Sequence, residues 1–201
     1  TTFCYSKKER RDIQLTKLII QGGNELNGII QNQGAKNSAL HVIAGSLLAS
    51  GEVVLKNVPK LQDVVNMIAL VQDVGTDIVW KDKTLKIVPK DISSPVVPKE
   101  SAMKVRSSLL MLSILLNKIG HVILPLPGGC EIGSRKFDMH LDGLRAMGAE
   151  VKLKDGFIEA KAKRLHGAKI RFYYPTVTGT MNLVLAASLA ELVGEASERL
   201  H

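Results

Sequence analysis

Aromatic residues are scarce in this chain of 201 residues: they make up 4% of it, whereas hydrophobic residues make up 45%. A core can therefore form, but it must consist mainly of Leu, Ile, Val, Ala and Met side chains. Basic residues are not interleaved with aromatic ones, as they are in proteins that bind single-stranded nucleic acid, and zinc-finger spacing is missing. The sequence therefore gives no support to a nucleic-acid partner.

Cysteine is also rare. Cys4 and Cys130 lie far apart in the sequence, which favours reduced thiols and disfavours a disulfide framework. No apolar run approaches the roughly 18 residues of a membrane span, and residues 1–15 lack the apolar centre of a secretory signal. These absences favour a cytoplasmic protein that has no membrane partner.

The charge balance is basic, with a formal net charge of +8. Part of it lies in residues 7–12, KKERRD, and we expect residues 1–16 to be a flexible N-terminal extension. The remaining positive charge is spread along the chain. A basic balance suits an anionic partner such as a phosphorylated metabolite.

An internal repeat organises the rest of the sequence. DVGTDIVWKDKTLKI (73–87) aligns with AMGAEVKLKDGFIEA (146–160), so that Gly75 falls on Gly148 with an offset of 73. Each copy reads as a helix, a strand, a second helix and a hairpin. The first copy is expected at 38–49, 52–56, 64–74 and 77–88, and the second at 107–118, 121–124, 138–147 and 150–160. A third copy begins at 165–172 and 180–191 and stops after its first helix. Such units imply an α/β fold in which stacked copies share one core.

The stretch QGAKNSAL (33–40) opens the first helix of the first copy. Lys36 and Asn37 lie at the expected helix start, where main-chain amides and the helix dipole favour an anion. The alternative is that Asn37 or Ser38 caps the helix and Lys36 is a solvated surface lysine.

Arg106, in VRSSLL, occupies the same point of the second copy, again as either a surface charge or a ligand-binding residue. Because repeats bring corresponding helix starts together, Lys36 and Arg106 are expected to form one cationic site.

The second copy carries an extra loop, PGGCEIG (127–133), that contains a cysteine among glycines. Such a loop has many accessible conformations and can serve as a lid. Arg135 nearby favours the thiolate form of Cys130, whereas Glu131 opposes it. A structural cysteine usually lies in an apolar run, so this pattern favours a functional thiol.

Several stretches together resemble one enzyme family. They are KLIIQGGNELNGIIQNQGAKNSAL, GEVVLKNVPKLQDVVNM, PGGCEIGSRKFDMHLDGLRAMGAE and DGFIEAKA. In these the chain is similar to UDP-N-acetylglucosamine 1-carboxyvinyltransferase, from about Lys17 to Glu191, and PGGC-x-IG-x-R together with GAKNSAL is specific to that family. The resemblance implies an enolpyruvyl transferase fold, which is an inside-out α/β barrel with helices inside and sheets outside. Two full repeats and a truncated third would then be present.

The resemblance also implies a reaction. Phosphoenolpyruvate and UDP-N-acetylglucosamine would give an enolpyruvyl ether and phosphate by addition and then elimination, without a cofactor or a metal. This is the first committed step of peptidoglycan synthesis, a cytoplasmic process that serves cell wall biogenesis, cell shape and cell division. Both substrates would be small-molecule partners of the chain.

Site residues follow from the resemblance position by position. Cys130 would be a catalytic lid thiol and Lys36 would contact phosphoenolpyruvate, while Asn37 would bind the amino sugar. Phosphates would be met by Arg106, by Arg135 and by Thr176, Val177, Thr178 and Gly179. The uridine pocket would be lined by Arg135, Lys136, Phe137, Asp138 and Met139. The family usually has proline at the position of Lys136, so this pocket is expected to be less rigid here.

The resemblance covers only the N-terminal portion of the family. Residues 17–35 would be a strand segment that is normally shared with a second domain, and 36–201 would be an incomplete transferase domain. The second domain of the family supplies an aspartate base and further arginines. Three interpretations therefore remain: an N-terminal portion of the enzyme, inactive when alone; a truncated copy that binds UDP-sugar weakly or not at all; or an interaction module that associates through exposed repeat faces.

Overall fold

The computed structural model describes most of the chain: residues 22, 23, 25, 27–126 and 137–191. The chain divides into residues 1–32 and a compact unit of residues 33–201, which contains every helix and strand named below. Part of the segment expected to be a strand, residues 17–21, lies outside the described residues. Its described remainder, up to residue 35, contains no strand.

The expected order of helix, strand, helix and hairpin occurs twice. The first copy comprises α1 (Lys36–Gly45) with the 3-10 turn η1 (Ser46–Leu48), β1 (Val53–Leu55), α2 (Gln62–Asp73), β2 (Thr76–Lys81) and β3 (Thr84–Pro89). The second comprises η2 (Arg106–Leu109) and α4 (Leu110–Ile119), β4 (His121–Pro125), α5 (Asp138–Ala146), β5 (Glu150–Lys154) and β6 (Phe157–Lys161). Between the copies lies a short helix that the sequence did not indicate, α3 (Lys99–Ala102), and α6 (Val177–Ala187) follows the second copy.

The strands of each copy form their own antiparallel sheet. The strand order is β1-β3-β2 in the first sheet and β4-β6-β5 in the second. Trp80 pairs with Leu85, and Leu153 pairs with Ile158, so the two hairpins have the same register at the offset found in the sequence. Asp82 and Asp155 take positive φ angles of 53° and 50° at the equivalent turn, a conformation that Asp tolerates in tight hairpins.

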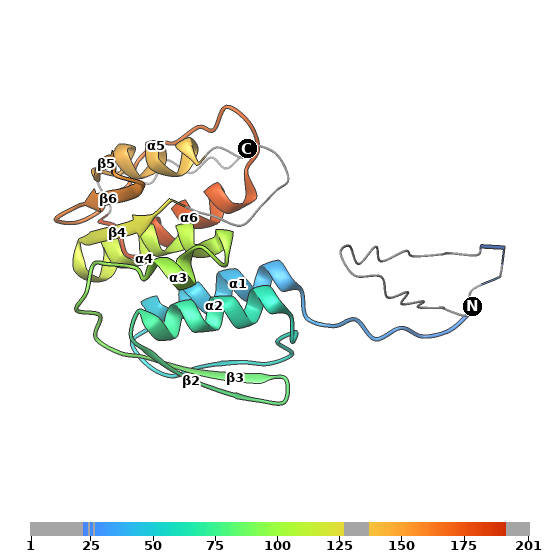
Figure 1. The fold of residues 1–201 in the computed structure, drawn as a ribbon. Helices are drawn as coiled ribbons and strands as arrows, with labels where there is room; N and C mark the ends of the chain where they lie inside the picture. Colours follow the sequence, from blue (N-terminus) through green and yellow to red (C-terminus); the bar gives the residue numbers. More distant parts are fainter. Residues whose placement is uncertain (1–21, 24, 26, 127–136, 192–201) are drawn as a thin grey trace, which may run out of the picture. The chain divides into compact units, whose positions relative to one another are not determined.

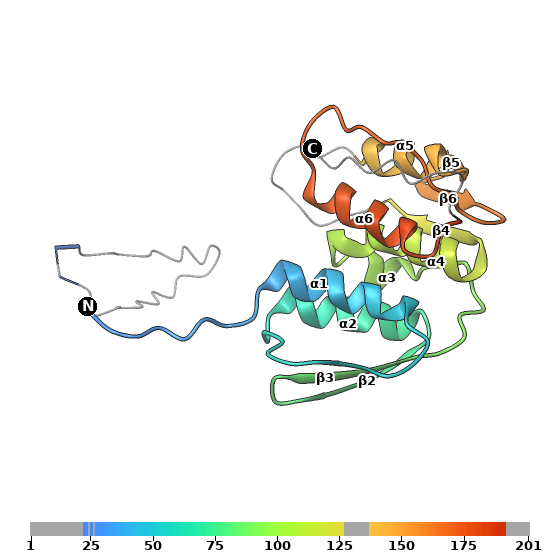
Figure 2. The same cartoon turned by 180° about the vertical axis from the view of Figure 1, so that it is seen from behind.

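The helices α1, α2 and α4 lie between the hairpin β2–β3 and the second sheet and contribute to one core. In Figure 1 the hairpin runs along the lower edge with α2 and then α1 above it, β4 and β6 lie above α4, and α5 lies at the top beside β5; Figure 2 shows the same order from behind. Every residue of α4 from Leu110 to Leu116 is buried, as expected of a central helix that is apolar all round. Among the described residues, the buried core contains no aromatic side chain, in agreement with the composition.

Polar contacts fix α6 against α4 within this core. The Ser113 hydroxyl lies 2.7 Å from the main-chain oxygen of Asn182 and 2.8 Å from its Oδ1. One turn later, Asn117 Nδ2 donates to the carbonyls of Leu185 and Ala186 at 2.9 and 3.2 Å. These bonds set the position of α6 along α4, and so they also set where the N-terminus of α6 lies.

Candidate functional site

The N-terminal ends of three helical segments meet at one pocket of about 350 Å³. They are the starts of α1, of η2 where it runs into α4, and of α6. The pocket is lined by Lys36, Asn37, Leu40, His41, Asp63, Lys104, Val105, Arg106, Ser107, Val177 and Thr178. The expected meeting of corresponding repeat starts is therefore present, and Lys36 and Arg106 line the same pocket.

The helix starts make this pocket suited to an anion. A helix N-terminus presents main-chain N–H groups and the positive end of the helix dipole. No acidic residue lies in the first turn of α1, η2 or α6. The first residue of α1 is Lys36, and Ala35, which precedes it, offers no side-chain cap. The alternative in which Asn37 or Ser38 caps this helix is therefore wrong, because both lie inside it.

Two of the pocket cations form ion pairs with acidic side chains. Lys36 Nζ lies 2.6 Å from Asp63 Oδ2, and the two side chains are 45% and 42% exposed. Lys104 Nζ lies 2.9 Å from Glu100 Oε1, one helical turn earlier in the chain. Arg106 contributes a further positive charge to the same wall. The pocket thus combines cations from different segments with an acid at its edge.

Two histidines near the pocket remain neutral at neutral pH. Burial lowers the pKa of His41, which lines the pocket one turn after Asn37. The pKa of His140, a residue of α5 that is 3% exposed, is lowered to about 4 by burial and, secondarily, by the charge of Arg106. Its Nδ1 has no hydrogen-bond partner within the described part of the chain. The positive charge of the site therefore comes from lysine and arginine.

Among the residues that the resemblance implied, Lys36, Asn37, Arg106, Val177 and Thr178 line this pocket. Thr176 instead occupies the N-cap of α6, where its Oγ1 accepts a hydrogen bond from the Gly179 N–H at 3.2 Å. A Cβ at Gly179 would lie 2.5 Å from Thr176 Cγ2, so only glycine fits against this cap. Thr176 and Gly179 thus shape the helix start that carries Val177 and Thr178.

Of the residues implied for the uridine pocket, the described ones, Phe137, Asp138 and Met139, lie at the start of α5 and do not line the pocket described above. Met139 is buried and Phe137 is packed partly against the core. Asp138 is exposed and its charge contributes, after burial and Tyr174, to a raised pKa of Tyr173. The remaining implied residues, Cys130, Arg135 and Lys136, lie outside the described residues.

Asp63, His41 and Lys104 line the pocket although the sequence reasoning did not select them. Asp63 carried a usable signal, because an acid is favoured in the first turn of a helix. We expected that helix at 64–74, whereas α2 begins at Gln62 and includes Asp63. His41 and Lys104 carried no signal of this kind, because only packing brings them to the wall.

A larger hollow of about 650 Å³ lies where the C-terminal end of α4 meets the segment after β6. Lys118, Lys163 and Arg164 line it, and Arg164 Nη1 lies 2.6 Å from Glu191 Oε1. The negative end of the α4 dipole lies here, so these cations already have a favourable partner. This hollow is therefore less suited to an anion than the pocket at the helix starts.

In the described part of the chain, His, Cys, Asp and Glu residues form no group of three or more that could hold a metal ion. None of its helices combines the length and the hydropathy needed to cross a membrane.

The fold finds its counterparts among enolpyruvyl transferases. Residues 20–198 match the model of the family described as EPSP synthase (3-phosphoshikimate 1-carboxyvinyltransferase), and the chain belongs to this family. Within it the chain is a homologue of UDP-N-acetylglucosamine 1-carboxyvinyltransferases, which confirms the resemblance seen in its motifs. It is 45% identical to those of Carboxydothermus hydrogenoformans and Halorhodospira halophila, over 177 residues in each case.

The match covers 88% of this chain but 42% of either relative, so the chain spans less than half of their length. Solved structures agree on the fold. EPSP synthase from Acinetobacter baumannii superposes with a TM-score of 0.64 at 16% identity, over 86% of this chain and 41% of that one. The enolpyruvyl transferase NikO from Streptomyces tendae gives 0.60 at 23% identity, over 72% and 32%. The chain therefore has part of the enolpyruvyl transferase fold.

Proposed function

We propose that this chain forms the part of a UDP-N-acetylglucosamine 1-carboxyvinyltransferase that binds the phosphates of both substrates. The observation that carries the proposal is the pocket where the starts of α1, η2 and α6 meet, with Lys36 and Arg106 in its wall. Both substrates, phosphoenolpyruvate and the UDP-sugar, are phosphorylated anions. A pocket with main-chain N–H groups, helix dipoles and cations binds such groups without a metal.

The reaction that follows from this proposal makes and breaks bonds in two steps. A hydroxyl oxygen of the sugar gives up its proton and bonds to the central carbon of phosphoenolpyruvate, while the methylene carbon takes up a proton as the double bond is lost. The tetrahedral adduct then loses phosphate and a proton, which restores the double bond as an enol ether. Lys36 and Arg106 would hold the phosphate groups in place and stabilise the charge on the leaving phosphate.

The other roles rest on the resemblance. Asn37 would bind the amino sugar, and the start of α6 from Thr176 to Gly179 would meet the diphosphate. Arg135 would bind phosphate, and the stretch from Arg135 to Met139 would line the uridine pocket. Cys130 would take part in proton transfer or in product release. The fold in which these residues act would be the inside-out α/β barrel of the family, and the product would enter peptidoglycan synthesis.

An interaction role is the second candidate, and it is favoured by one exposed surface. Val177, Met181 and Val184 follow one face of α6 and are 71%, 40% and 56% exposed. An apolar stripe of this kind is typical of a surface that another segment covers. Self-association of the 201-residue chain through this face would appear as a concentration-dependent mass in sedimentation experiments, and a Met181→Glu variant would abolish it.

Calorimetry with UDP-N-acetylglucosamine tests the primary proposal. We expect binding with a dissociation constant in the high-micromolar to millimolar range, roughly −4 to −5 kcal/mol, because only part of the family's site is present. Arg106→Ala, which removes the pocket cation expected to meet the substrate phosphates, should weaken binding severalfold. The matched control is Arg145→Ala, which removes an exposed arginine of α5 that does not line the pocket. The proposal is wrong if the folded chain produces neither heat nor a thermal shift at several millimolar ligand.

A further inference from the structure

The first two turns of α2 contact both cationic walls of the pocket. Asp63 and Asn66 are three residues apart on this helix, a spacing that places both side chains on the same face. Asp63 contacts Lys36 at the start of α1, and Asn66 contacts the main chain of Lys104, two residues before Arg106. One helix face is thus linked to the two segments that carry Lys36 and Arg106.

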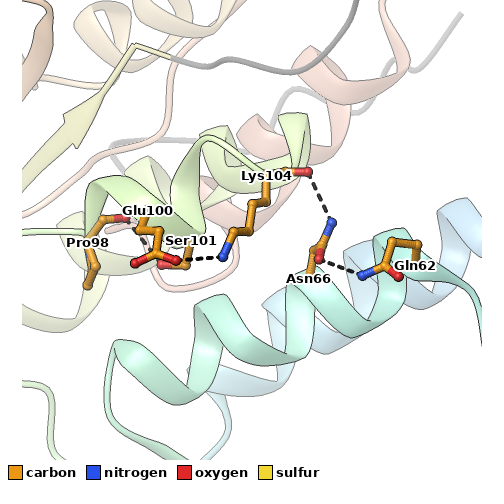
Figure 3. A network of polar contacts seen from close by, with 6 residues as sticks. All are labelled: Gln62, Asn66, Pro98, Glu100, Ser101 and Lys104. Atoms are coloured by element: carbon orange, nitrogen blue, oxygen red, sulfur yellow. Dashed lines mark hydrogen bonds and ion pairs between the residues drawn. The ribbon is translucent and has the colours of Figure 1, made fainter. Parts of the chain in front are cut away.

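The Gln62 side chain determines which end of the Asn66 amide faces Lys104. Gln62 Nε2 donates to Asn66 Oδ1 at 3.0 Å, one turn away on the same helix. With its oxygen engaged, Asn66 uses Nδ2 to donate to the Lys104 carbonyl at 3.3 Å, as Figure 3 shows. This bond joins α2 to the turn between α3 and η2, across 38 residues of sequence.

The segment before Arg106 is held at a further point. Lys104 Nζ donates to Glu100 Oε1 of α3 at 2.9 Å, and α3 itself is held at its start by the bond from Ser101 Oγ to the Pro98 carbonyl at 3.2 Å (Figure 3). The main chain of Lys104 is therefore held by α2 while its side chain is held by α3. Fixing this segment on both sides pre-organises Arg106 for a ligand, because less conformational freedom is lost on binding.

The ion pair between Asp63 and Lys36 fixes the position of the Lys36 side chain more than it stabilises the fold. Both members of the pair with Lys36 are more than 40% exposed, and exposed ion pairs contribute little to folding. Lys36 is the first residue of α1, and its flexible side chain could otherwise extend into solvent. The short contact of 2.6 Å keeps its ammonium group at the edge of the pocket.

We propose that Asp63 and Asn66 are positioning residues, which hold Lys36 and the Arg106 segment in place for a phosphorylated ligand. This inference rests on the proposed phosphate-binding function for its purpose. The contacts themselves can be tested without a ligand, so an experiment can contradict the contacts and the proposed function independently.

Selective acetylation tests the Asp63 contact in the full 201-residue chain. Acetylation by an N-hydroxysuccinimide ester, followed by peptide mass mapping, reports how well the Lys36 amine is shielded. Asp63→Asn should raise the rate at Lys36 about two- to fivefold, the factor expected for loss of an exposed ion pair. Asp73→Asn is the matched control, because it makes the same change of charge at an exposed position on the same helix. Equal rates at Lys36 in Asp63→Asn and in the parent chain would overturn this half of the proposal.

Hydrogen–deuterium exchange tests the Asn66 contact. Asn66→Ala should speed exchange of the Lys104 and Ser108 amides, which donate to the Ser101 and Val105 carbonyls, about fivefold, because one hydrogen bond that holds this segment is lost. Gln72→Ala, at an exposed position near the end of α2, should leave those amides unchanged. A thermal unfolding curve for each variant shows that it is folded. Unchanged exchange in Asn66→Ala would overturn this half of the proposal.

Binding of UDP-N-acetylglucosamine and of phosphoenolpyruvate then connects the contacts to function. If the parent chain binds, Asn66→Ala should weaken UDP-N-acetylglucosamine binding at least about threefold, and Asp63→Asn should weaken phosphoenolpyruvate binding by a similar factor, whereas Gln72→Ala and Asp73→Asn should change neither. If the contacts are confirmed and affinity is nevertheless unchanged, the positioning role is wrong. If the parent chain does not bind at all, it is the proposed function that fails, and acetylation and exchange still decide whether the contacts exist in solution.

Discussion

The Ser113 hydroxyl lies 2.8 Å from Asn182 Oδ1 inside the fully buried contact between α4 and α6. This pair joins the second repeat to the first helix of the third across 69 residues of sequence. Because the contact sets the register of α6, it also determines that Val177 and Thr178 reach the pocket. A buried polar pair of this kind specifies one alignment of two otherwise apolar helices.

Ser113→Ala should lower the free energy of unfolding by about 1–3 kcal/mol, because it leaves a buried acceptor of Asn182 without its donor. Urea denaturation measures the change. Ser50→Ala, at an exposed position, should change stability by less than about 0.5 kcal/mol. An equally small effect at Ser113 would mean that the hydroxyl does not hold the two helices together.

Acid should destabilise the chain through His140. Its pKa is 6.5 in the unfolded chain and about 4 in the folded one, so between these values the unfolded state binds the extra proton. This contribution to stability is complete above pH 6.5 and falls as the pH drops toward 4, by an amount on the order of 3 kcal/mol. The free energy of unfolding, measured at a series of pH values, should depend less on pH in His140→Gln than in the parent chain, and His166→Gln is the control. The same pH dependence in the parent chain and in His140→Gln would contradict this origin.

Arg106 should influence His140 measurably. Burial is the larger cause of the low pKa of His140, and the charge of Arg106 is the smaller one. Arg106→Met should therefore raise the pKa of His140 part of the way from about 4 toward 6.5, as followed by an NMR titration of its ring protons. Arg145→Met removes a cation that is paired with Asp142 on the same helix, and it should leave His140 unchanged. An identical His140 titration in Arg106→Met and the parent chain would show that the two side chains are not coupled.

Two glycines with similar main-chain angles should differ in their tolerance of alanine. Gly120 and Gly156 have φ angles of 70° and 80°, but a Cβ at Gly120 would lie 2.6 Å from the Ala162 carbonyl oxygen, whereas the space at Gly156 is open. Gly156→Ala should cost about 1 kcal/mol for the left-handed conformation alone. Gly120→Ala should cost at least about 1 kcal/mol more, because a main-chain atom must move. Equal losses in chemical denaturation would mean that the contact relaxes without cost.

The 201-residue chain alone should release no phosphate from phosphoenolpyruvate when UDP-N-acetylglucosamine is supplied. It spans 42% of the length of its relatives, and the resemblance implies that a second domain supplies the base and further arginines. Each missing electrostatic contact costs roughly 3–4 kcal/mol in the transition state. The full-length relative from Carboxydothermus hydrogenoformans serves as the positive control. If this chain does release phosphate, and Lys36→Ala abolishes that activity, then the chain forms an active site without the second domain.

The sequence by itself determined the order of the elements within each repeat. Apolar periodicity marked the helices, and KDK and KDG marked the hairpin turns, where Asp82 and Asp155 adopt the positive φ angles that such turns need. These signals are local, since the period of a helix and the chemistry of a turn depend on residues close in the chain. The repeat alignment went further, because it predicted that Lys36 and Arg106 would come together.

Only the tertiary structure decided which neighbours complete the pocket. Asp63 and Lys104 reach its wall because α2 packs against α1 and the segment before α4, and His140 has a lowered pKa because the packing of α5 against α6 and β5 buries it. The start of α1 at Lys36, without a side-chain cap, likewise differs from what Asn37 and Ser38 favour locally. Residue type and spacing determine a helix, but burial, pairing and the direction of a side chain depend on segments far apart in the sequence, and these are fixed only when the repeats pack around a common core.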